Sequence, residues 1–251
     1  MGFSRAWKGR LAQLVEHLAY TERVGGSRPS PPTIPVWVRA LALALSAWLF
    51  AAPGLARAEP MRFRLIDLDS GRCGARCPQA IAADGVIEAE TPEAFVAFAK
   101  QAAQSPGLRS VVFLSSPGGN VVASMELGAV FRKLHVAAIV ARFDSGAPEA
   151  GPFAGQCISA CVYAMMGAVR RIAPPGSRVG LHRMSIVEHG FFSTTRTLAD
   201  PELVAALSRY AARMGVGRGL VTLAESLDPE IVHLLTRGEM ARWRLATAQF
   251  Y

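Results

Sequence analysis

Three short stretches of the sequence carry residues whose types and spacing could do chemistry. Ser159 lies between two cysteines in GQCISACVY, residues 155–163, where a glycine-bearing loop is expected to meet a helix. Upstream, SSPGGN at 115–120 is expected at a strand-to-helix junction. Glycines there can turn backbone N–H groups outward, and the helix adds its positive end, an arrangement suited to an oxyanion. Downstream, His182 ends a predicted strand, so its ring can reach into a cleft.

Each of these residues also has an ordinary structural explanation. A serine at a helix N-terminus is usually a cap, and Ser159 could equally fill space in a disulfide-pinned turn. The paired glycines, Gly118 and Gly119, can merely permit a tight turn. Three other histidines are interpreted as structural or surface residues: His135, His189 and His233. The chemistry therefore depends on whether the three stretches meet in the fold.

The elements that must position these residues alternate between strand and helix. The predicted strands are 62–68, 85–90, 110–116 and 136–141, followed by a strand–turn–strand unit that ends at His182. The predicted helices are 91–104 with Thr91 as N-cap, one after the PGG at 117–119, a short one ending near Ala168, one starting from Asp200, and two or three over 217–246. The predicted loops are 145–155 and 186–199. This alternation implies an α/β domain with a mostly parallel sheet and active groups on loops that leave strand ends.

Two longer stretches give the sequence a family resemblance. VVFLSSPGGNVVASMELGAVFRK and CISACVYAMMGAVRRIAPPGSRVGLHR, in this order, resemble the Clp protease proteolytic-subunit and crotonase superfamily, and most closely its periplasmic Clp-protease-like bacterial members. A third, more degenerate stretch begins YAARMGVGRGL and extends the resemblance over most of 85–247. The resemblance implies an α/β fold of strand–strand–helix units in a right-handed spiral, with a mostly parallel sheet flanked by helices.

The resemblance also implies a role for each matching residue. Ser159 would be the nucleophile and His182 its general base. The oxyanion hole would be built at the glycine loop, Gly118 and Gly119, and at Ala160, with the N–H groups of Gly119 and Ala160 as the donors. The third member of the triad is expected in SLDPEIVHLLTRGEM, where Asp228 is the candidate. Two further acids are close to it in the sequence: Glu225 and Glu230.

The lysine content excludes one variant of this chemistry. Signal-peptide peptidases of the superfamily use a Ser–Lys dyad with the lysine downstream of the serine. The lysines of this chain are Lys8, Lys100 and Lys133, and none follows Ser159. His182 is therefore the remaining candidate for the base.

The segment before the predicted domain has two parts. The first does not resemble a coding sequence. Residues 9–34 resemble a transfer RNA gene read as protein, because 11–17 can be back-translated to contain the D-arm consensus TAGCTCAG. We expect 1–35 to be a spurious, disordered extension, with the true start near Val36 or Val38. A disordered Pro- and Ser-rich leader is the alternative.

The second part, 36–58, is predicted to be a secretory signal peptide. Arg39 supplies the positive charge, 40–52 the apolar region, and 56–58 an A-x-A cleavage site before Glu59. The apolar run is too short to span a bilayer, so a membrane contact is expected only if the signal stays uncleaved. We expect a periplasmic or secreted protein, with 59–251 forming a single Clp-protease-like α/β domain.

The charge and cysteine content limit the partners. Seven of the 27 Lys and Arg residues and two of the 19 acidic residues fall in the first 58, which leaves 20 basic and 17 acidic side chains in the domain. So balanced a surface does not favour nucleic acid or anionic membrane as a partner.

Export permits disulfides among two C-x3-C pairs, Cys73/Cys77 and Cys157/Cys161. A local Cys73–Cys77 bridge is favoured. Cys157 and Cys161 could bridge or pack as thiols, and a four-cysteine zinc site has unusual spacing.

Together these observations favour an exported serine hydrolase that cleaves a peptide or another acyl bond through an acyl-enzyme. No metal, cofactor or nucleotide is expected, and a homo-oligomer is an open expectation because relatives form rings or stacks. The main alternative is an inactive scaffold that keeps the fold for binding. A third interpretation is a crotonase-like acyl-thioester enzyme. Two observations weaken it: export would separate the protein from coenzyme A, and the chain has few lysines to bind the phosphates of that nucleotide.

Overall fold

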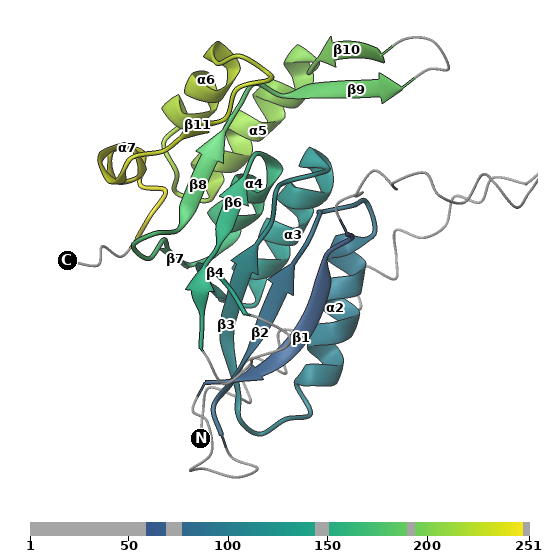
Figure 1. Cartoon of the computed structure of the whole chain (residues 1–251), viewed down its shortest axis with the longest axis vertical. Helices are drawn as coiled ribbons and strands as arrows, with labels where there is room; N and C mark the ends of the chain where they lie inside the picture. Colours follow the sequence, from purple (N-terminus) through teal and green to yellow (C-terminus); the bar gives the residue numbers. More distant parts are fainter. Residues whose placement is uncertain (1–58, 69–76, 144–150, 190–193, 248–251) are drawn as a thin grey trace, which may run out of the picture.

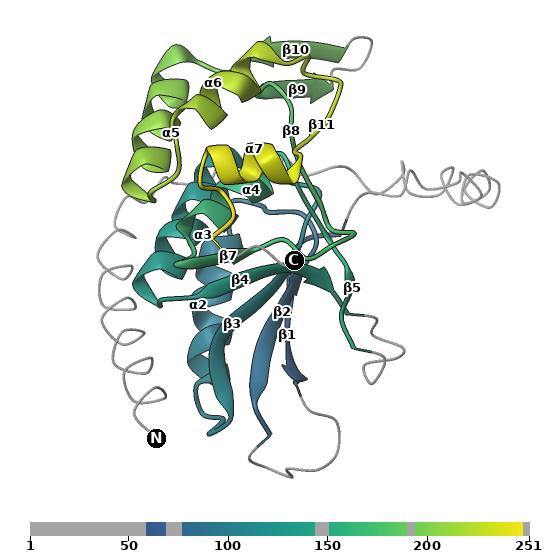
Figure 2. The same cartoon turned by 90° about the vertical axis from the view of Figure 1, so that its left-hand side faces the viewer.

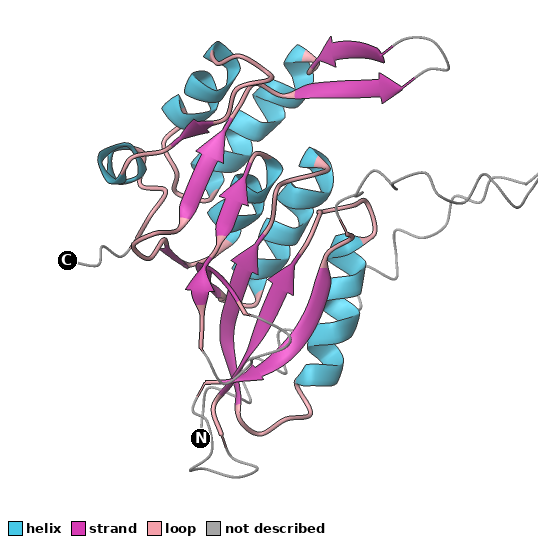
Figure 3. Cartoon of the chain, viewed as in Figure 1, coloured by secondary structure: helices cyan, strands magenta, loops and turns pink. Residues whose placement is uncertain are grey.

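The computed structural model describes residues 59–68, 77–143, 151–189 and 194–247. The expected N-terminal extension and signal peptide, 1–35 and 36–58, lie outside these residues. Within the described ranges, strands and helices alternate along much of the chain (Figures 1 and 3). A search of the same ranges finds no helix with the length and apolar character to cross a membrane.

Among the described residues, the main sheet has six strands. They are β1 (Arg62–Asp67), β2 (Gln79–Asp84), β3 (Leu108–Ser115), β4 (Ala137–Arg142), β5 (Phe153–Ala154) and β7 (Arg170–Ile172). Strands β2, β3, β4 and β7 run parallel to one another, whereas β1 and β5 join antiparallel at β2 and β4. The predicted class, a mixed α/β domain with a mostly parallel sheet flanked by helices, is confirmed.

Two helices cover one face of this sheet. Helix α2 (Thr91–Ala102) and helix α3 (Val121–Lys133) lie side by side against it, and α4 (Ala160–Gly167) packs against α3 (Figure 2). The rings of Phe95 and Phe131 join α2 to α3 with their centroids 5.1 Å apart, and both side chains are fully buried. Three further helices follow near the C-terminus: α5 (Pro201–Arg213), α6 (Gly219–Ser226) and α7 (Arg237–Arg242).

A second, three-stranded sheet carries the candidate site. Strand β6 (Gln156–Ile158) runs parallel to β8 (Arg178–Leu181), and β11 (His233–Leu234) pairs antiparallel with the other edge of β8. A bridge between Ser116 and Cys157 connects this sheet to the end of β3. The SSPGGN loop is thereby held next to the segment that contains Ser159.

The strand predicted over 85–90 is wrong. The strand in this part of the chain is β2, which ends at Asp84, before the predicted range begins. Gly85 follows it with a φ of 125°, so the backbone turns there. Beyond the turn, Val86 and Ile87 form only isolated bridges. The alanine-rich sequence of β2 has low strand propensity, and its burial between β1 and β3 decides its structure. Helix α2 starts as predicted, but its N-cap is Glu90.

The loop predicted over 186–199 is also wrong. It is a hairpin of β9 (Ser185–His189) and β10 (Thr194–Leu198), with Ser185 paired to Leu198, and it projects from the body of the domain (Figure 1). The segment is polar but rich in β-branched residues, which favour strands. A two-stranded ribbon outside the main sheets lacks the one-sided packing that produces an apolar–polar alternation, so its sequence pattern resembles a loop.

Candidate active site

Neighbouring parallel strands bring Ser159 and His182 to the same edge of the second sheet. The register pairs Ile158 of β6 with Gly180 of β8, and the N–H of Ser159 donates to the carbonyl of Gly180 at 2.8 Å. His182 lies two residues beyond Gly180, just after β8 ends. Paired strands lie about 4.8 Å apart, so the two residues leave the sheet side by side.

Ser159 has an unusual backbone conformation. It immediately precedes α4, yet its φ is 56° and its ψ is −124°, and its side chain makes no capping hydrogen bond. A non-glycine residue held in a sparsely populated region costs on the order of 1–3 kcal/mol and persists only where the surrounding structure imposes it. The side chain is partly exposed, and its hydroxyl has no hydrogen-bond partner among the described residues. The ordinary explanation of Ser159 as a helix cap is therefore wrong.

A disulfide encloses this serine. Cys157 in β6 and Cys161 in the first turn of α4 are bonded, with their Cα atoms 5.1 Å apart, and both are fully buried. Of the two alternatives for this pair, a bridge or packed thiols, the bridge is confirmed. Because bonded sulfurs are not thiolates, Cys157 and Cys161 cannot be ligands of the four-cysteine zinc site. Cys77 is also disulfide-bonded. Cys73 lies outside the described residues, so the Cys73–Cys77 pairing stays a prediction.

The glycine loop contacts the serine. A Cβ at Gly118 would lie 2.9 Å from the Cβ of Ser159 and 3.3 Å from the nitrogen of Ala160. Gly119 has a φ of 136°, and a Cβ there would lie 2.1 Å from the carbonyl oxygen of Ile87. Both glycines are therefore required by close contact as well as by the turn, and the contact at Gly118 joins the two loops of the candidate site.

Two backbone N–H groups, one from each loop, remain unpaired in the described part of the chain. The N–H of Gly118 donates to the Ser116 hydroxyl at 3.1 Å, so it is not free to bind an anion. Neither Gly119 nor Ala160 donates its N–H to any described acceptor. Ala160 is the first residue of α4, where the first N–H groups have no partner within the helix and the helix dipole favours negative charge. These two donors are the pair expected for an oxyanion hole.

The imidazole of His182 is oriented by a backbone carbonyl. Its Nδ1 lies 2.8 Å from the carbonyl oxygen of Arg183. Because a carbonyl only accepts, Nδ1 carries the proton and Nε2 keeps a lone pair, which is the tautomer a general base needs. No hydrogen bond joins Nε2 to the Ser159 hydroxyl among the described residues. Catalytic hydrogen bonds are often long before substrate binds.

Among the described residues, no hydrogen bond or ion pair joins Asp228 to His182. It lies in an exposed turn between α6 and β11, where its carboxylate accepts from the N–H of Glu230 at 2.7 Å. The β8–β11 register pairs Leu181 with His233, so the next pair places Val232 opposite His182. In the described ranges, a carbonyl holds the imidazole where the sequence predicted a carboxylate. Sequence reasoning could not find it, because every residue has a carbonyl.

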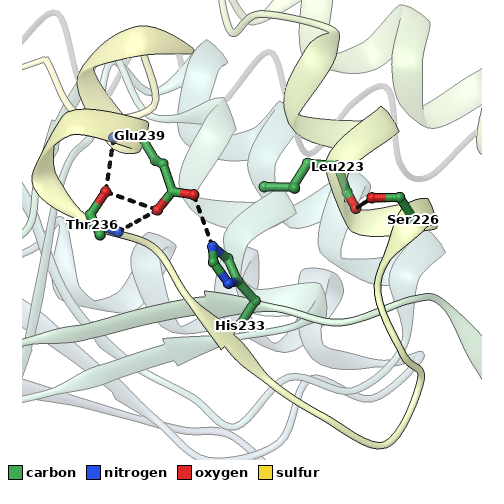
Figure 4. Close-up of polar contacts among 5 residues, drawn as sticks. All are labelled: Leu223, Ser226, His233, Thr236 and Glu239. Atoms are coloured by element: carbon green, nitrogen blue, oxygen red, sulfur yellow. Dashed lines mark hydrogen bonds and ion pairs between the residues drawn. The ribbon is translucent and has the colours of Figure 1, made fainter.

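A capping box connects β11 to α7 (Figure 4). The side chain of Glu239 accepts from Thr236 through both the backbone N–H and the hydroxyl, each at 2.8 Å, and the hydroxyl accepts from the N–H of Glu239 at 3.2 Å. The other carboxylate oxygen lies 2.9 Å from His233 Nε2. At the end of α6, Ser226 donates to the carbonyl of Leu223 (Figure 4). His233 thus has a structural role beside the strand that carries the site.

We expect Glu239 to make stability depend on acid pH. The backbone N–H of Thr236, then His233 and the Thr236 hydroxyl, lower the pKa of Glu239 from 4.5 to about 2. A depressed carboxyl pKa stabilises the fold above pH 4.5, and this stabilisation is lost as the pH falls towards 2. Urea unfolding at stepwise pH should show the loss, and Glu239→Gln should remove that part of the pH dependence. Identical profiles for the two proteins would contradict the assignment.

Comparisons with known proteins give structural neighbours only. No protein-family model matches the sequence, and no curated protein is similar to it. Two solved variants of the 1510-N membrane-bound stomatin-specific protease resemble the chain at 18% and 20% identity, with TM-scores of 0.47 and 0.46. Each similarity covers 67% of this chain and 76% or 72% of the neighbour, and the second is a complex with a substrate peptide.

A third neighbour is a ClpP1 variant from Listeria monocytogenes. It has 15% identity and a TM-score of 0.43, over 68% of this chain and 89% of its own. At these values the likeness assigns no activity to the present chain.

Proposed function

We propose that the chain is an exported serine hydrolase that cleaves peptide bonds through an acyl-enzyme. The observation that carries the proposal is the conformation of Ser159. Its hydroxyl and the neighbouring N–H of Ala160 both lack a hydrogen-bond partner among the described residues. A strained serine between a strand and a helix presents its hydroxyl to a substrate, as a capping serine cannot. The choice of a peptide bond rests on the sequence resemblance.

In the proposed mechanism, Ser159 Oγ attacks the substrate carbonyl while His182 Nε2 takes its proton. The N–H groups of Gly119 and Ala160 bind the oxyanion of the tetrahedral intermediate. Collapse of this intermediate breaks the C–N bond, and the imidazolium gives its proton to the leaving amine. Water then attacks the acyl-enzyme ester while His182 takes its proton. The C–O bond to Ser159 breaks, and the imidazolium returns the proton to Ser159 Oγ as the acid is released.

The proposed location outside the cytoplasm rests on the predicted signal peptide and agrees with the cysteine chemistry. The Cys157–Cys161 bridge and the bonded state of Cys77 support it, because disulfides persist in oxidising compartments. Outside the cytoplasm the proposed substrates are peptides. Assembly with further copies of the chain is part of the proposal only as an expectation from the resemblance.

A specific observation favours the alternative, an inactive binding scaffold. In the described ranges, no carboxylate is bonded to His182, and no hydrogen bond joins His182 to Ser159. Replacing the triad acid by an amide can lower kcat by about 10⁴-fold, so a site without an acid needs another way to hold its imidazole. The scaffold would keep the loops and the disulfide for binding and would not turn over.

Labelling with a fluorophosphonate probe distinguishes the two functions. We expect residues 59–251, folded and with disulfides formed, to be labelled at Ser159. Ser159→Ala and His182→Ala should both abolish labelling, because the probe reacts only with an activated serine. Peptide mass mapping identifies the modified residue. A folded protein that takes up no probe would favour the scaffold.

A further inference from the structure

Next to His182 in the chain, Arg183 forms a partly buried ion pair with Glu225 in which two buried polar atoms are unsatisfied. Arg183 Nε and Glu225 Oε1 are buried and have no hydrogen-bond partner among the described residues. The two side chains form an ion pair, with Arg183 Nε 3.7 Å from Glu225 Oε2. A buried polar group without a partner is costly, and each such group in a folded protein calls for an explanation.

The ion pair and the hydrogen bond that sets the imidazole tautomer share one residue, Arg183. Arg183 provides the carbonyl that accepts from His182 Nδ1, and its own side chain is held by Glu225. The Glu225 side chain is only 18% exposed, whereas that of Arg183 is 40% exposed. The Glu225 side chain is therefore the more restricted of the two, and its carboxylate holds the Arg183 side chain in place.

Glu225 is also close to the helix that follows the serine. Burial, and secondarily the charge of Glu225, raise the pKa of Tyr163, which is fully buried in the first turns of α4. The carboxylate on α6 thus lies near the element that starts at Ser159 and is bound to the residue that follows His182. It is placed to fix the two halves of the candidate site relative to each other.

We infer that Glu225 is a positioning residue, which acts through Arg183 to keep the Nδ1-protonated tautomer of His182. The inference rests on the proposed serine hydrolase. It assigns to an ion pair and a carbonyl the orienting role that a carboxylate has in a Ser-His-Asp triad. Glu225 also compensates the positive charge of Arg183, the residue that follows His182, which favours formation of an imidazolium during the reaction.

The test compares Glu225→Gln with Glu230→Gln, which removes a carboxylate from an exposed pair with Arg196. We expect Glu225→Gln to slow fluorophosphonate labelling and lower kcat by about tenfold or more with KM unchanged, because positioning acts on the chemical step. Glu230→Gln should label at the wild-type rate. Exchanging the charges, with Arg183→Glu and Glu225→Arg together, should restore part of the lost rate. Circular dichroism confirms that each variant is folded.

A second readout does not require activity. Nitrogen-15 NMR of the imidazoles, with His182→Ala to assign the signal, should show the Nδ1-protonated tautomer in the wild type and a mixture of tautomers in Glu225→Gln. An unchanged tautomer and labelling rate in Glu225→Gln would overturn the inference and leave the hydrolase intact. Loss of labelling in Asp228→Asn, with Glu225→Gln unaffected, would overturn it in favour of Asp228.

Failure of the proposed function gives a different result. If the folded wild type is not labelled, the hydrolase proposal fails, and the tautomer alone decides whether Glu225 positions His182. A tautomer that changes in Glu225→Gln then supports the positioning role, and one that does not change overturns it.

Discussion

Replacing Gly119 by alanine is expected to lower kcat about a hundredfold to a thousandfold, the effect of losing one oxyanion-hole donor. A Cβ at this position would lie 2.1 Å from the carbonyl oxygen of Ile87, and the φ of 136° is one that an L side chain rarely adopts. The backbone must therefore shift, and the N–H of Gly119 moves with it. Ser159 and His182 remain, so KM should change less than kcat, as steady-state kinetics can show.

Gly215→Ala is the matched control for this substitution. Gly215 also has a positive φ, 76°, but a Cβ there meets nothing within 4 Å. The variant carries the backbone strain, about 1–3 kcal/mol of stability, without disturbing the site. It should keep wild-type kcat. A Gly119→Ala protein that is folded and as active as Gly215→Ala would remove Gly119 from the oxyanion hole.

The second large effect concerns packing. Gly167→Ala in α4 is expected to destabilise the fold by about 1–3 kcal/mol or more, the cost of overpacking a close contact. The added Cβ would lie 1.9 Å from the carbonyl oxygen of Gly128 in α3, a backbone atom that cannot move aside as a side-chain end could. Helices α3 and α4 would have to separate, and α4 follows directly from Ser159. Urea denaturation measures the loss of unfolding free energy.

A glycine-to-alanine substitution in a less crowded helix should have the opposite effect on the free energy of unfolding. Gly238 lies in α7, where a Cβ would meet only the hydroxyl of Thr236 at 3.9 Å. Alanine is favoured over glycine in a helix interior by about 1 kcal/mol, so Gly238→Ala should stabilise the protein or leave it unchanged. If both variants gained stability, helix propensity would dominate and the tight α3–α4 contact would be refuted.

Local sequence signals were sufficient for many of the elements. Asp200 followed by Pro201 predicted the start of α5, and the Asp200 carboxylate accepts from the N–H of Glu202 at 2.7 Å. The uncharged β-branched run at 110–116 predicted β3 because a buried strand needs such residues. Capping and burial depend on neighbouring residues in the chain, so the sequence contains their signal.

The errors occurred where tertiary contacts override local propensity. Strand β2 is built from small residues and owes its structure to pairing with β1 and β3. The β9–β10 hairpin is a two-stranded ribbon, and its polar sequence resembles a loop. Neither pairing can be read from periodicity, because the partner strand, and not the strand itself, supplies the stabilising contacts.

For the candidate site, the sequence alone determined the residue types and their order: a glycine pair, a serine between cysteines, and a histidine after a strand, with no downstream lysine. Only the tertiary structure decided which groups meet and in what state. It gave Ser159 a positive φ and bonded His182 to the carbonyl of Arg183. Within the part of the chain that the structure describes, it left the N–H groups of Gly119 and Ala160 without an acceptor. These properties belong to backbone conformation and strand register, which arise from contacts between distant segments and leave no residue-type signal of their own.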